Sequence, residues 1–399
     1  MKFKKILFTA GAMLFFWSIY DGIISYLVPV FITNRGYSNS VVGLLISLSA
    51  ISGAIFDIII SKFIRGAHYL KYFLLVFILS FAMPLVLWSA STISLFILAM
   101  AMWGLYYDLM NFGIFDLASR ISQKHEHTKN ISIIGVFKTV GYFIGPPLIA
   151  YIITFSSVSL TPIAPIYIFL IIAAIIYIIL FSLTDARDFI RPVTYRESHV
   201  YWFKELIVWK KLAKVLLPVL IFNILFYIFE ATFWTLGPIF SQQFPDSQHF
   251  SGLFMIVYVL PAVIAAGFAE KITGWFGKKR TAYVAFIISN LFLIPLGPFA
   301  TPTLILVLVF ISTIAGSLAW SAISGAFVDY LSETDLYDSE IIGLKDFSAN
   351  TGYILGPILA GVISDIVGIS YTFTILGIIN ILVVIYLFSI TPKNIVIPD

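Results

Sequence analysis

The chain has 399 residues, of which 60% are apolar, 17% are aromatic and only 11% are charged. Soluble proteins carry roughly a quarter charged residues, so this composition excludes an ordinary soluble domain and indicates an integral membrane protein. The formal net charge is +4, and the absence of cysteine excludes disulfide bonds and thiol chemistry.

Apolar runs of about twenty residues follow one another along the chain, each long enough to cross a hydrocarbon core of ~30 Å. The twelve runs are 6–32, 40–60, 70–88, 93–119, 131–154, 162–183, 214–241, 250–270, 281–298, 303–330, 341–364 and 369–391. Isolated strands leave backbone groups unsatisfied in lipid, so we expect every run to be a helix. The sequence therefore predicts an all-α integral membrane protein with twelve transmembrane helices.

The Lys and Arg residues predict the orientation of these helices. They gather at the N-terminus, in every second loop and at the C-terminus, whereas the intervening loops contain Arg35 alone. By the positive-inside rule, both termini face the cytoplasm of a multi-pass protein in the cell membrane. The positive charge thus reports orientation and does not indicate nucleic-acid binding. The first run is too long for the apolar region of a signal peptide, so we expect a retained helix.

The longest polar segment divides the runs six and six. We therefore expect an N-terminal six-helix bundle at 1–184, a cytoplasmic linker at 185–213 and a C-terminal six-helix bundle at 214–399. The linker interleaves basic residues with Trp202 and Trp209, a pattern that fits either an amphipathic helix on the membrane surface or a solvated connection.

The two halves share a sequence repeat. Asp21 and Glu230 are 209 residues apart, and the Pro, Gly and Lys residues that follow each of them keep the same offset. The run Gly141-xxx-Gly145-Pro146 recurs as Gly352-xxx-Gly356-Pro357, with an offset of 211. These matches indicate an internal duplication.

Twelve spans, two related halves and cytoplasmic termini resemble the major facilitator superfamily. In that family, two six-helix bundles rock about a solute site near the middle of the membrane. The resemblance implies a monomeric secondary active transporter for a small-molecule substrate, with no enzyme activity, cofactor or metal. ATP-driven transport is not expected, because the chain has no Gly-rich phosphate loop followed by Lys and Ser or Thr. His125-Glu126-His127 could bind a metal, but a solvated loop is the better interpretation.

Two motifs carry the finer resemblance. The Gly141, Gly145, Pro146 run looks like part of the glycine-proline motif of antiporters in this family, although close helix packing alone accounts for it and for its second copy. A second family motif, which supplies charge pairs to a cytoplasmic gate, is degenerate in both halves. The gate candidates are Asp57, Lys62, Asp116, Lys138, Glu270, Lys271 and Asp329. For the lysines, an equally good explanation is that their long side chains reach to the membrane surface. Asp116 and Asp329 suit either gate or capping roles. Lys138 could pair with an acid such as Glu270 or with a carboxylate of the substrate.

Three acids lie deep within predicted spans. Asp21, Asp108 and Glu230 fall in spans one, four and seven, which line the solute cavity in the family that the chain resembles. A carboxylate inside a membrane span is costly and is a functional-site hypothesis by default. Removal from water favours the protonated form, so we interpret these acids as proton carriers. The alternative is an acid hydrogen-bonded to its neighbours that never exchanges its proton.

Aromatic and amide residues accompany the acids. The cavity candidates are Trp17, Tyr20, Tyr107, Asn111, Tyr227, Trp234 and Trp320. Aromatic faces beside carboxylates suit an organic cation or an amphipathic molecule, so the first hypothesis is proton-coupled export by antiport. Proton-coupled uptake of a sugar or other metabolite is the alternative. A membrane receptor or enzyme is a remote third, since it would call for converging His, Ser or metal ligands.

Overall fold

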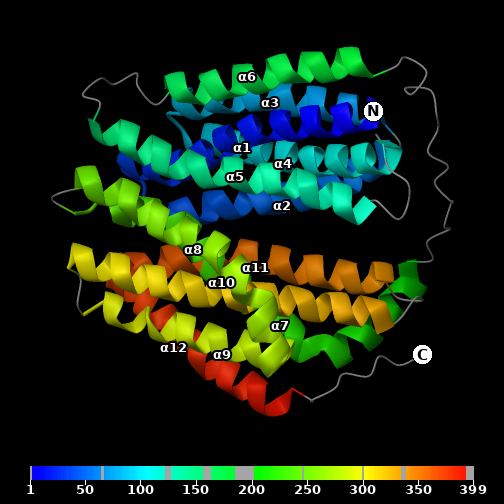
Figure 1. Cartoon of the computed structure of the whole chain (residues 1–399). Helices are drawn as coiled ribbons and strands as arrows, with labels where there is room; N and C mark the ends of the chain where they lie inside the picture. Colours follow the sequence, from blue (N-terminus) through cyan, green and yellow to red (C-terminus); the bar gives the residue numbers. More distant parts are fainter. Residues whose placement is uncertain are drawn as a thin grey trace. The chain divides into compact units, whose positions relative to one another are not determined.

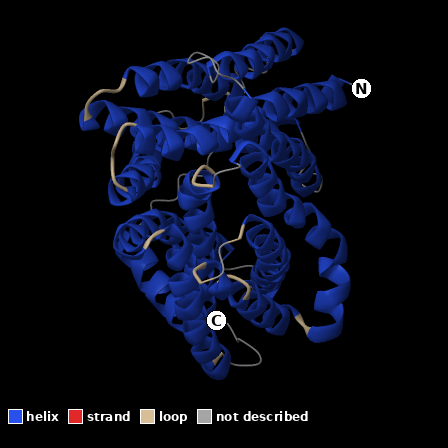
Figure 2. Cartoon of the chain, turned by 90° about the vertical axis from the view of Figure 1, so that its left-hand side faces the viewer, coloured by secondary structure: helices blue, strands red, loops and turns tan. Residues whose placement is uncertain are grey.

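The computed structural model describes residues 2–63, 67–121, 127–155, 163–184, 202–244, 247–298, 301–333 and 338–391. Within these ranges the chain is helical, with short turns (Figure 2). The first half contains α1 (Lys2–Asn34), α2 (Asn39–Phe63), α3 (Tyr69–Ser89), α4 (Ile93–Ile121), α5 (His127–Phe155) and α6 (Ile163–Leu183). The second half contains α7 (Trp202–Ser241), α8 (Ser247–Phe276), α9 (Lys278–Leu291), the 3₁₀ helix η2 (Ile294–Leu296), α10 (Pro302–Glu333), α11 (Asp338–Val367) and α12 (Ile369–Ile390).

The predicted all-α membrane class is confirmed. In the described residues, eleven helices are long and apolar enough to cross a bilayer, and α8 makes up to twelve if its two segments, bent by 57°, form one span. The observed ends differ most from the predicted ones at two places. Helix α7 begins at Trp202, because the Lys-rich turns before residue 214 continue the helix, and α9 ends at Leu291, ahead of a short 3₁₀ turn that contains Pro295.

The chain forms two compact units. Unit 1 comprises residues 1–36, 45–196 and 246–252, and unit 2 comprises 37–44, 197–245 and 253–399. Of the predicted linker, residues 185–201 lie outside the described residues, and 202–213 are the first turns of α7. In unit 1, α1 packs along α5 and α6, and α3 packs along α4 (Figure 1). In unit 2, α11 packs along α7, while α9 packs along α10 and α12.

Glycines set the closest helix contacts in both units. A Cβ atom added to Gly145 of α5 would lie 2.5 Å from the carbonyl oxygen of Ile19 in α1. A Cβ added to Gly356 of α11 would lie 2.7 Å from the Cβ of Ala231 in α7. Both distances are too short for a real side chain, so the repeated glycine motif brings α5 against α1 and α11 against α7 at backbone separation.

Prolines inside helices leave carbonyl oxygens that neighbouring hydroxyl groups satisfy. Pro84 of α3 has no N–H for the carbonyl of Ser80, and the Tyr20 hydroxyl donates to that oxygen at 2.8 Å. Pro261 of α8 likewise frees the carbonyl of Val257, which accepts from the Thr313 hydroxyl at 3.1 Å. These bonds explain how prolines are tolerated within membrane-spanning helices.

Asp365, near the end of α11, caps the first turn of α2 inside unit 2. Its carboxylate accepts from the backbone N–H groups of Asn39 and Ser40 at 3.0 and 2.9 Å, and from the Ser40 hydroxyl. The first N–H groups of a helix have no intrahelical acceptor and carry partial positive charge, so a carboxylate there stabilises the helix start.

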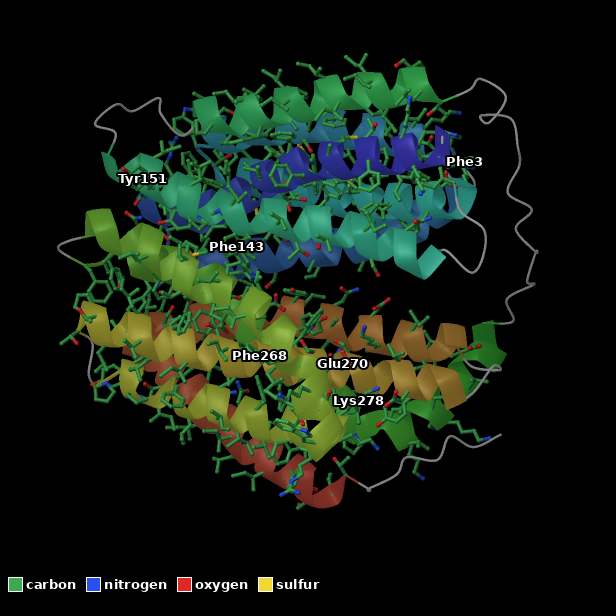
Figure 3. The ribbon with its side chains drawn as sticks, in the orientation of Figure 1. Phe3, Phe143, Tyr151, Phe268, Glu270 and Lys278 are labelled. Atoms are coloured by element: carbon green, nitrogen blue, oxygen red, sulfur yellow. The ribbon has the colours of Figure 1, made fainter. Side chains whose placement is uncertain are left out.

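Large apolar side chains project outward from both units. Tyr151 of α5 and Phe268 of α8 are each more than half exposed, and Figure 3 shows them extending from their ribbons. Helix α6 exposes six isoleucine and phenylalanine side chains from Ile168 to Phe181 to nearly half or more of their surface. Water would disfavour so much exposed apolar surface, whereas hydrocarbon would not, so these faces are the lipid-contacting surface.

Candidate functional site

The Asp21 carboxyl group lies in the interior of unit 1 and is only 1% exposed. Its Oδ1 accepts hydrogen bonds from the Tyr106 hydroxyl at 2.8 Å and the Trp103 indole N–H at 3.2 Å. Trp103 and Tyr106 are three residues apart on α4, so both donors project from one face of that helix. The second oxygen, Oδ2, is buried and has no hydrogen-bond partner in the described structure.

An aromatic cluster surrounds this acid. Trp17 and Tyr20 are fully buried, and their polar atoms donate to the Oγ and the carbonyl of Ser80 on α3. The ring of Tyr106 meets the ring of Trp17 edge-on, with centroids 5.7 Å apart. The predicted cavity residues Trp17 and Tyr20 thus fill the interior of unit 1 and hold α1 against α3, while keeping water from Asp21.

Asp108 lies on the opposite side of α4 from Tyr106. A Cβ added to Gly53 of α2 would overlap its Oδ2 atom, so the carboxylate packs against α2. Asp21 of α1 therefore contacts α4, whereas Asp108 of α4 packs against α2, so the two acids lie against different helices.

Lys138 of α5 lies beside two other predicted cavity residues. Its Nζ donates to Asn111 Oδ1 at 3.3 Å and stands 4.6 Å from the centre of the Tyr107 ring. Its charge also acts on the Asp21 carboxylate. Tyr107 is 39% exposed, so this group reaches the surface of unit 1. The predicted gate residue Lys138 is thus part of the Asp21 neighbourhood.

The second acid, Glu230, lies in unit 2 and lines a cavity of about 120 Å³. The carboxylate is hydrogen-bonded by the side chains of Trp234 and Tyr353. The cavity wall consists of Phe226, Phe229, Trp234, Tyr258, Val259, Ala262, Thr313, Gly316 and Ser317. An aromatic wall with one carboxylate is a suitable environment for a positively charged organic group.

Thr313 gives this cavity a hydroxyl group of defined polarity. Its Oγ1 lies within donor distance of the carbonyl oxygens of Val309 and Val257, at 2.8 and 3.1 Å. A hydroxyl group can donate only one hydrogen bond, and here the acceptors are backbone carbonyl oxygens. Toward the cavity Thr313 therefore offers lone pairs, which favours a ligand that donates hydrogen bonds.

A family model described as Major Facilitator Superfamily matches residues 6–334 and 219–398. The chain belongs to the major facilitator superfamily. It is accordingly a multi-pass membrane protein and a secondary transporter, not an enzyme. No curated protein matches the sequence.

Solved structures of this superfamily share the fold. The nucleoside transporter NupG is 14% identical, with a TM-score of 0.73 over 98% of this chain and 100% of that one. A peptide transporter named POT is 12% identical, with a TM-score of 0.74 over 98% and 94% of the two chains. A bacterial homolog of the human lysosomal transporter Spinster is 12% identical, with a TM-score of 0.69 over 97% and 95%. Identities this low establish the fold alone.

Two gate candidates of this major facilitator protein occupy equivalent structural positions. Asp116 of α4 accepts from the backbone N–H of Tyr69 at 2.7 Å and from Arg120 Nε at 2.6 Å. Asp329 of α10 pairs with Lys278 at 2.5 Å. Tyr69 and Lys278 are the first residues of α3 and α9, so each acid holds the start of the neighbouring helix. Asp116 accepts from a backbone N–H at the start of α3, whereas Asp329 is bonded to the Lys278 side chain, and the gate or capping roles of both acids stay predictions.

The remaining candidates make fewer contacts. Glu270 is exposed (Figure 3), and Lys271 stands 5.0 Å from the centre of the Trp275 ring. Tyr227 packs against Tyr353 with ring centroids 5.0 Å apart, and Trp320 is 45% exposed. The side chains of Asp57 and Lys62 lie outside the described residues, as does the His125-Glu126-His127 run. The described residues contain no group of three His, Cys, Asp or Glu side chains arranged to bind a metal.

Sequence reasoning missed several residues of both acid sites. They are Trp103, Tyr258, Thr313, Ser317 and Tyr353. Tyr353 had a signal, because it is the counterpart of Tyr142 within the repeated glycine-proline motif. The others lie on helices distant in sequence from the acids they serve, and the aromatic content of the chain is too high for any one ring to stand out.

Proposed function

We propose that this transporter couples the export of cationic or amphipathic organic compounds to the inward movement of protons. The observation that carries the proposal is that each half places one acid within its helices, at equivalent positions of the repeat, and holds it with one indole and one phenol donor. An ionisable side chain inside a membrane span costs free energy, and such residues commonly bind or transfer a proton or an ion.

Asp21 is the proposed proton carrier. Trp103 and Tyr106 stabilise the ionised form through Oδ1, while burial and the lack of a partner at Oδ2 stabilise the protonated form. Opposing contributions of this kind allow a carboxyl group to load and release a proton. Its bonds to α4 are strongest when it is ionised, so protonation alters how firmly α1 is tied to α4.

Glu230 is the proposed anchor for the positive group of the substrate. The aromatic rings of Phe226, Trp234 and Tyr258 supply negative faces, and Thr313 supplies an acceptor. Exchange follows if a proton on Asp21 and a cation at Glu230 favour different states of the transporter, and this coupling is the basis for proposing antiport.

The direction of transport rests on the orientation of the protein. The basic residues at the N-terminus and in alternate loops support cytoplasmic termini in the cell membrane. In a cell whose exterior is more acidic than its interior, exchange of protons for a cation expels the cation. Export is therefore the proposed physiological direction.

A second candidate function is proton-coupled uptake of a polar metabolite. The Lys138–Asn111 pair beside Asp21 favours it, because an ammonium and an amide together suit a solute with carboxylate or hydroxyl groups. In that case the proton and the solute would move in the same direction.

Proteoliposomes with an imposed pH gradient distinguish the two functions. With an acidic lumen, we expect ethidium, an aromatic organic cation, to accumulate inside as protons leave, and the reversed gradient to prevent accumulation. Accumulation of a labelled sugar or amino acid only when the exterior is acidic would establish uptake instead. The matched variants are Asp21→Asn, which should abolish gradient-driven movement, and Asp329→Asn, which removes an exposed acid and should leave it intact.

A further inference from the structure

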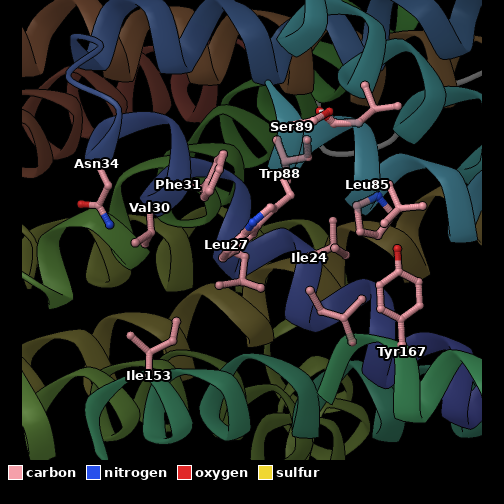
Figure 4. A pocket seen from close by; sticks show the side chains of 14 residues that line it. Ile24, Leu27, Val30, Phe31, Asn34, Leu85, Trp88, Ser89, Ile153 and Tyr167 are labelled. Atoms are coloured by element: carbon pink, nitrogen blue, oxygen red, sulfur yellow. The ribbon is translucent and has the colours of Figure 1, made fainter. Parts of the chain in front are cut away.

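A large apolar pocket lies in unit 1, apart from both acid sites. Its volume is about 710 Å³, within the roughly 300–1,000 Å³ range of small-molecule sites. One stripe of α1, formed by Ile24, Leu27 and Phe31, supplies one wall. The last turns of α3, together with Ile153 of α5 and the first turn of α6, supply the rest (Figure 4).

The pocket offers few polar groups to an occupant. The hydroxyl of Tyr167 donates to the Phe81 carbonyl at 3.0 Å, and that of Ser89 donates to the Val86 carbonyl at 3.1 Å. The protons of these two hydroxyl groups are thus used within the protein, which leaves Asn34 and Trp88 as the other lining residues with polar side-chain atoms. A solute that must be oriented needs several directed polar contacts, so this lining suits a hydrocarbon chain better than a transported metabolite.

The pocket is continuous with the lipid-contacting surface. Leu85 lines it and is also 59% exposed, and Ile168, next to the lining residue Tyr167, is 53% exposed. An acyl chain can therefore enter sideways from the bilayer. The same route is unfavourable for a water-soluble molecule.

Arg35 places a positive charge at the mouth. Its guanidinium stands 5.0 Å from the centre of the Phe31 ring and donates from Nη2 to the Trp88 carbonyl at 3.3 Å. The Phe31 and Trp88 rings are themselves stacked, with centroids 5.3 Å apart. Both rings line the pocket, so the guanidinium lies beside it, and the Trp88 carbonyl uses one of its five N–H donors. A guanidinium matches the oxygens of a phosphate.

We infer that this pocket binds one acyl chain of an anionic phospholipid, whose phosphate contacts Arg35. The C-terminal ends of α1 and α3 both line the pocket, so it lies at the opposite end of α1 from the N-terminus. With cytoplasmic termini, this is the outer leaflet. Ile24 is one turn from Asp21, so the bound chain packs against the helix segment that carries the proposed proton site.

Native mass spectrometry of the purified full chain tests the site. The probes are phosphatidylglycerol and phosphatidylcholine with identical acyl chains, added in equal amounts. We expect preferential retention of phosphatidylglycerol, and Arg35→Gln should reduce that preference about fivefold, the effect of one basic residue at an anionic lipid surface. Arg280→Gln, an exposed arginine in unit 2, should not change it.

Pocket-blocking variants test the acyl chain. Ile153→Trp should lower retention of both lipids, and Ile178→Trp, a lipid-facing position outside the pocket on α6, should not. Leu85→Gln makes the exposed wall polar and serves if Ile153→Trp is not monodisperse. An unchanged lipid ratio in Arg35→Gln, or unchanged retention in Ile153→Trp and Leu85→Gln, would overturn the inference. Displacement of the lipid by inorganic phosphate alone would also overturn it, because Arg35 would then be a simple anion site.

Discussion

Asp21 and Glu230 occupy the same place in the repeat, yet different helices hold them. Asp21 of α1 takes its indole and phenol donors from Trp103 and Tyr106, both on α4. Glu230 takes the same pair of donor types from Trp234 on its own helix and from Tyr353 on α11. One acid therefore links α1 to α4, and the other links α7 to α11.

The repeat itself explains how this difference arises. The counterparts of Trp234 and Tyr353 in unit 1 are Ser25 and Tyr142, which hydrogen-bond to each other at 2.5 Å instead of holding Asp21. Conversely, an offset of 212 places Ala315 and Leu318 where α4 has Trp103 and Tyr106, and neither has a side-chain donor. The two halves share the helix arrangement and the acid, but the hydrogen-bond donors to that acid come from different positions in each half. Proton handling and solute binding can thus be divided between them.

The largest expected difference comes from neutralising each acid. Asp21→Asn should reduce gradient-driven ethidium transport to the level of protein-free liposomes, while ethidium exchange at equal pH continues. Glu230→Gln should weaken ethidium binding about ten- to hundredfold, the range for losing a hydrogen bond to a charged group. Binding by fluorescence anisotropy and transport in proteoliposomes separate the two effects. Equal losses in both assays for both variants would remove the proposed division of roles.

Removing the phenol donors sharpens the same comparison. Tyr106→Phe deletes a donor to ionised Asp21, so its carboxyl should keep the proton to higher pH. The pH profile of transport should then move upward by about one to two units. Tyr353→Phe should instead weaken cation binding with little movement of the profile. Tyr386→Phe, at an exposed site on α12, is the control. A profile that moves only in Tyr353→Phe would reverse the assignment.

The glycine contacts provide a stability test. Gly145→Ala meets the backbone of α1, and we expect a loss of about 1–3 kcal/mol, measured by unfolding in detergent. Gly135→Ala on the same helix has open space around it and should stabilise α5 by up to about 1 kcal/mol. In unit 2, Gly356→Ala meets the Cβ of Ala231, so adding Ala231→Gly should restore stability. If Ala231→Gly did not restore stability, the backbone of α7, and not the Ala231 side chain, would set the separation from Gly356, as the backbone of α1 does for Gly145.

The exposed acid Asp329 should show the smallest effect, and its buried counterpart Asp116 provides the comparison. Asp329 pairs with Lys278 near the surface, and Asp329→Ala should cost less than about 1 kcal/mol. Its buried counterpart Asp116 accepts two hydrogen bonds, and Asp116→Ala should cost about 1.5–3 kcal/mol. Thermal unfolding of the two variants at low and high salt compares them, and only Asp329→Ala should lose its effect as salt screens the pair.

The sequence predicted the helices, the duplication and the positions of Asp21 and Glu230, because hydropathy, offset and intramembrane charge are local signals. It could not predict the donors of Asp21, since Trp103 and Tyr106 reach that acid only through the packing of α4 on α1. For the same reason, the sequence could not predict that Asp108 packs against α2 or that Lys138 bonds to Asn111. The sequence predicts how deep a residue lies along its helix, but it does not predict which neighbouring helix that residue contacts.

The single unpartnered oxygen of Asp21 also has a spectroscopic consequence. The carbonyl stretching vibration of a protonated carboxyl group falls in frequency with each hydrogen bond it accepts. With both donors on Oδ1 and none described at Oδ2, the protonated group should absorb in one of two well-separated positions, according to which oxygen holds the proton. Asp21 is therefore an intrinsic infrared reporter, and its band should be absent from Asp21→Asn.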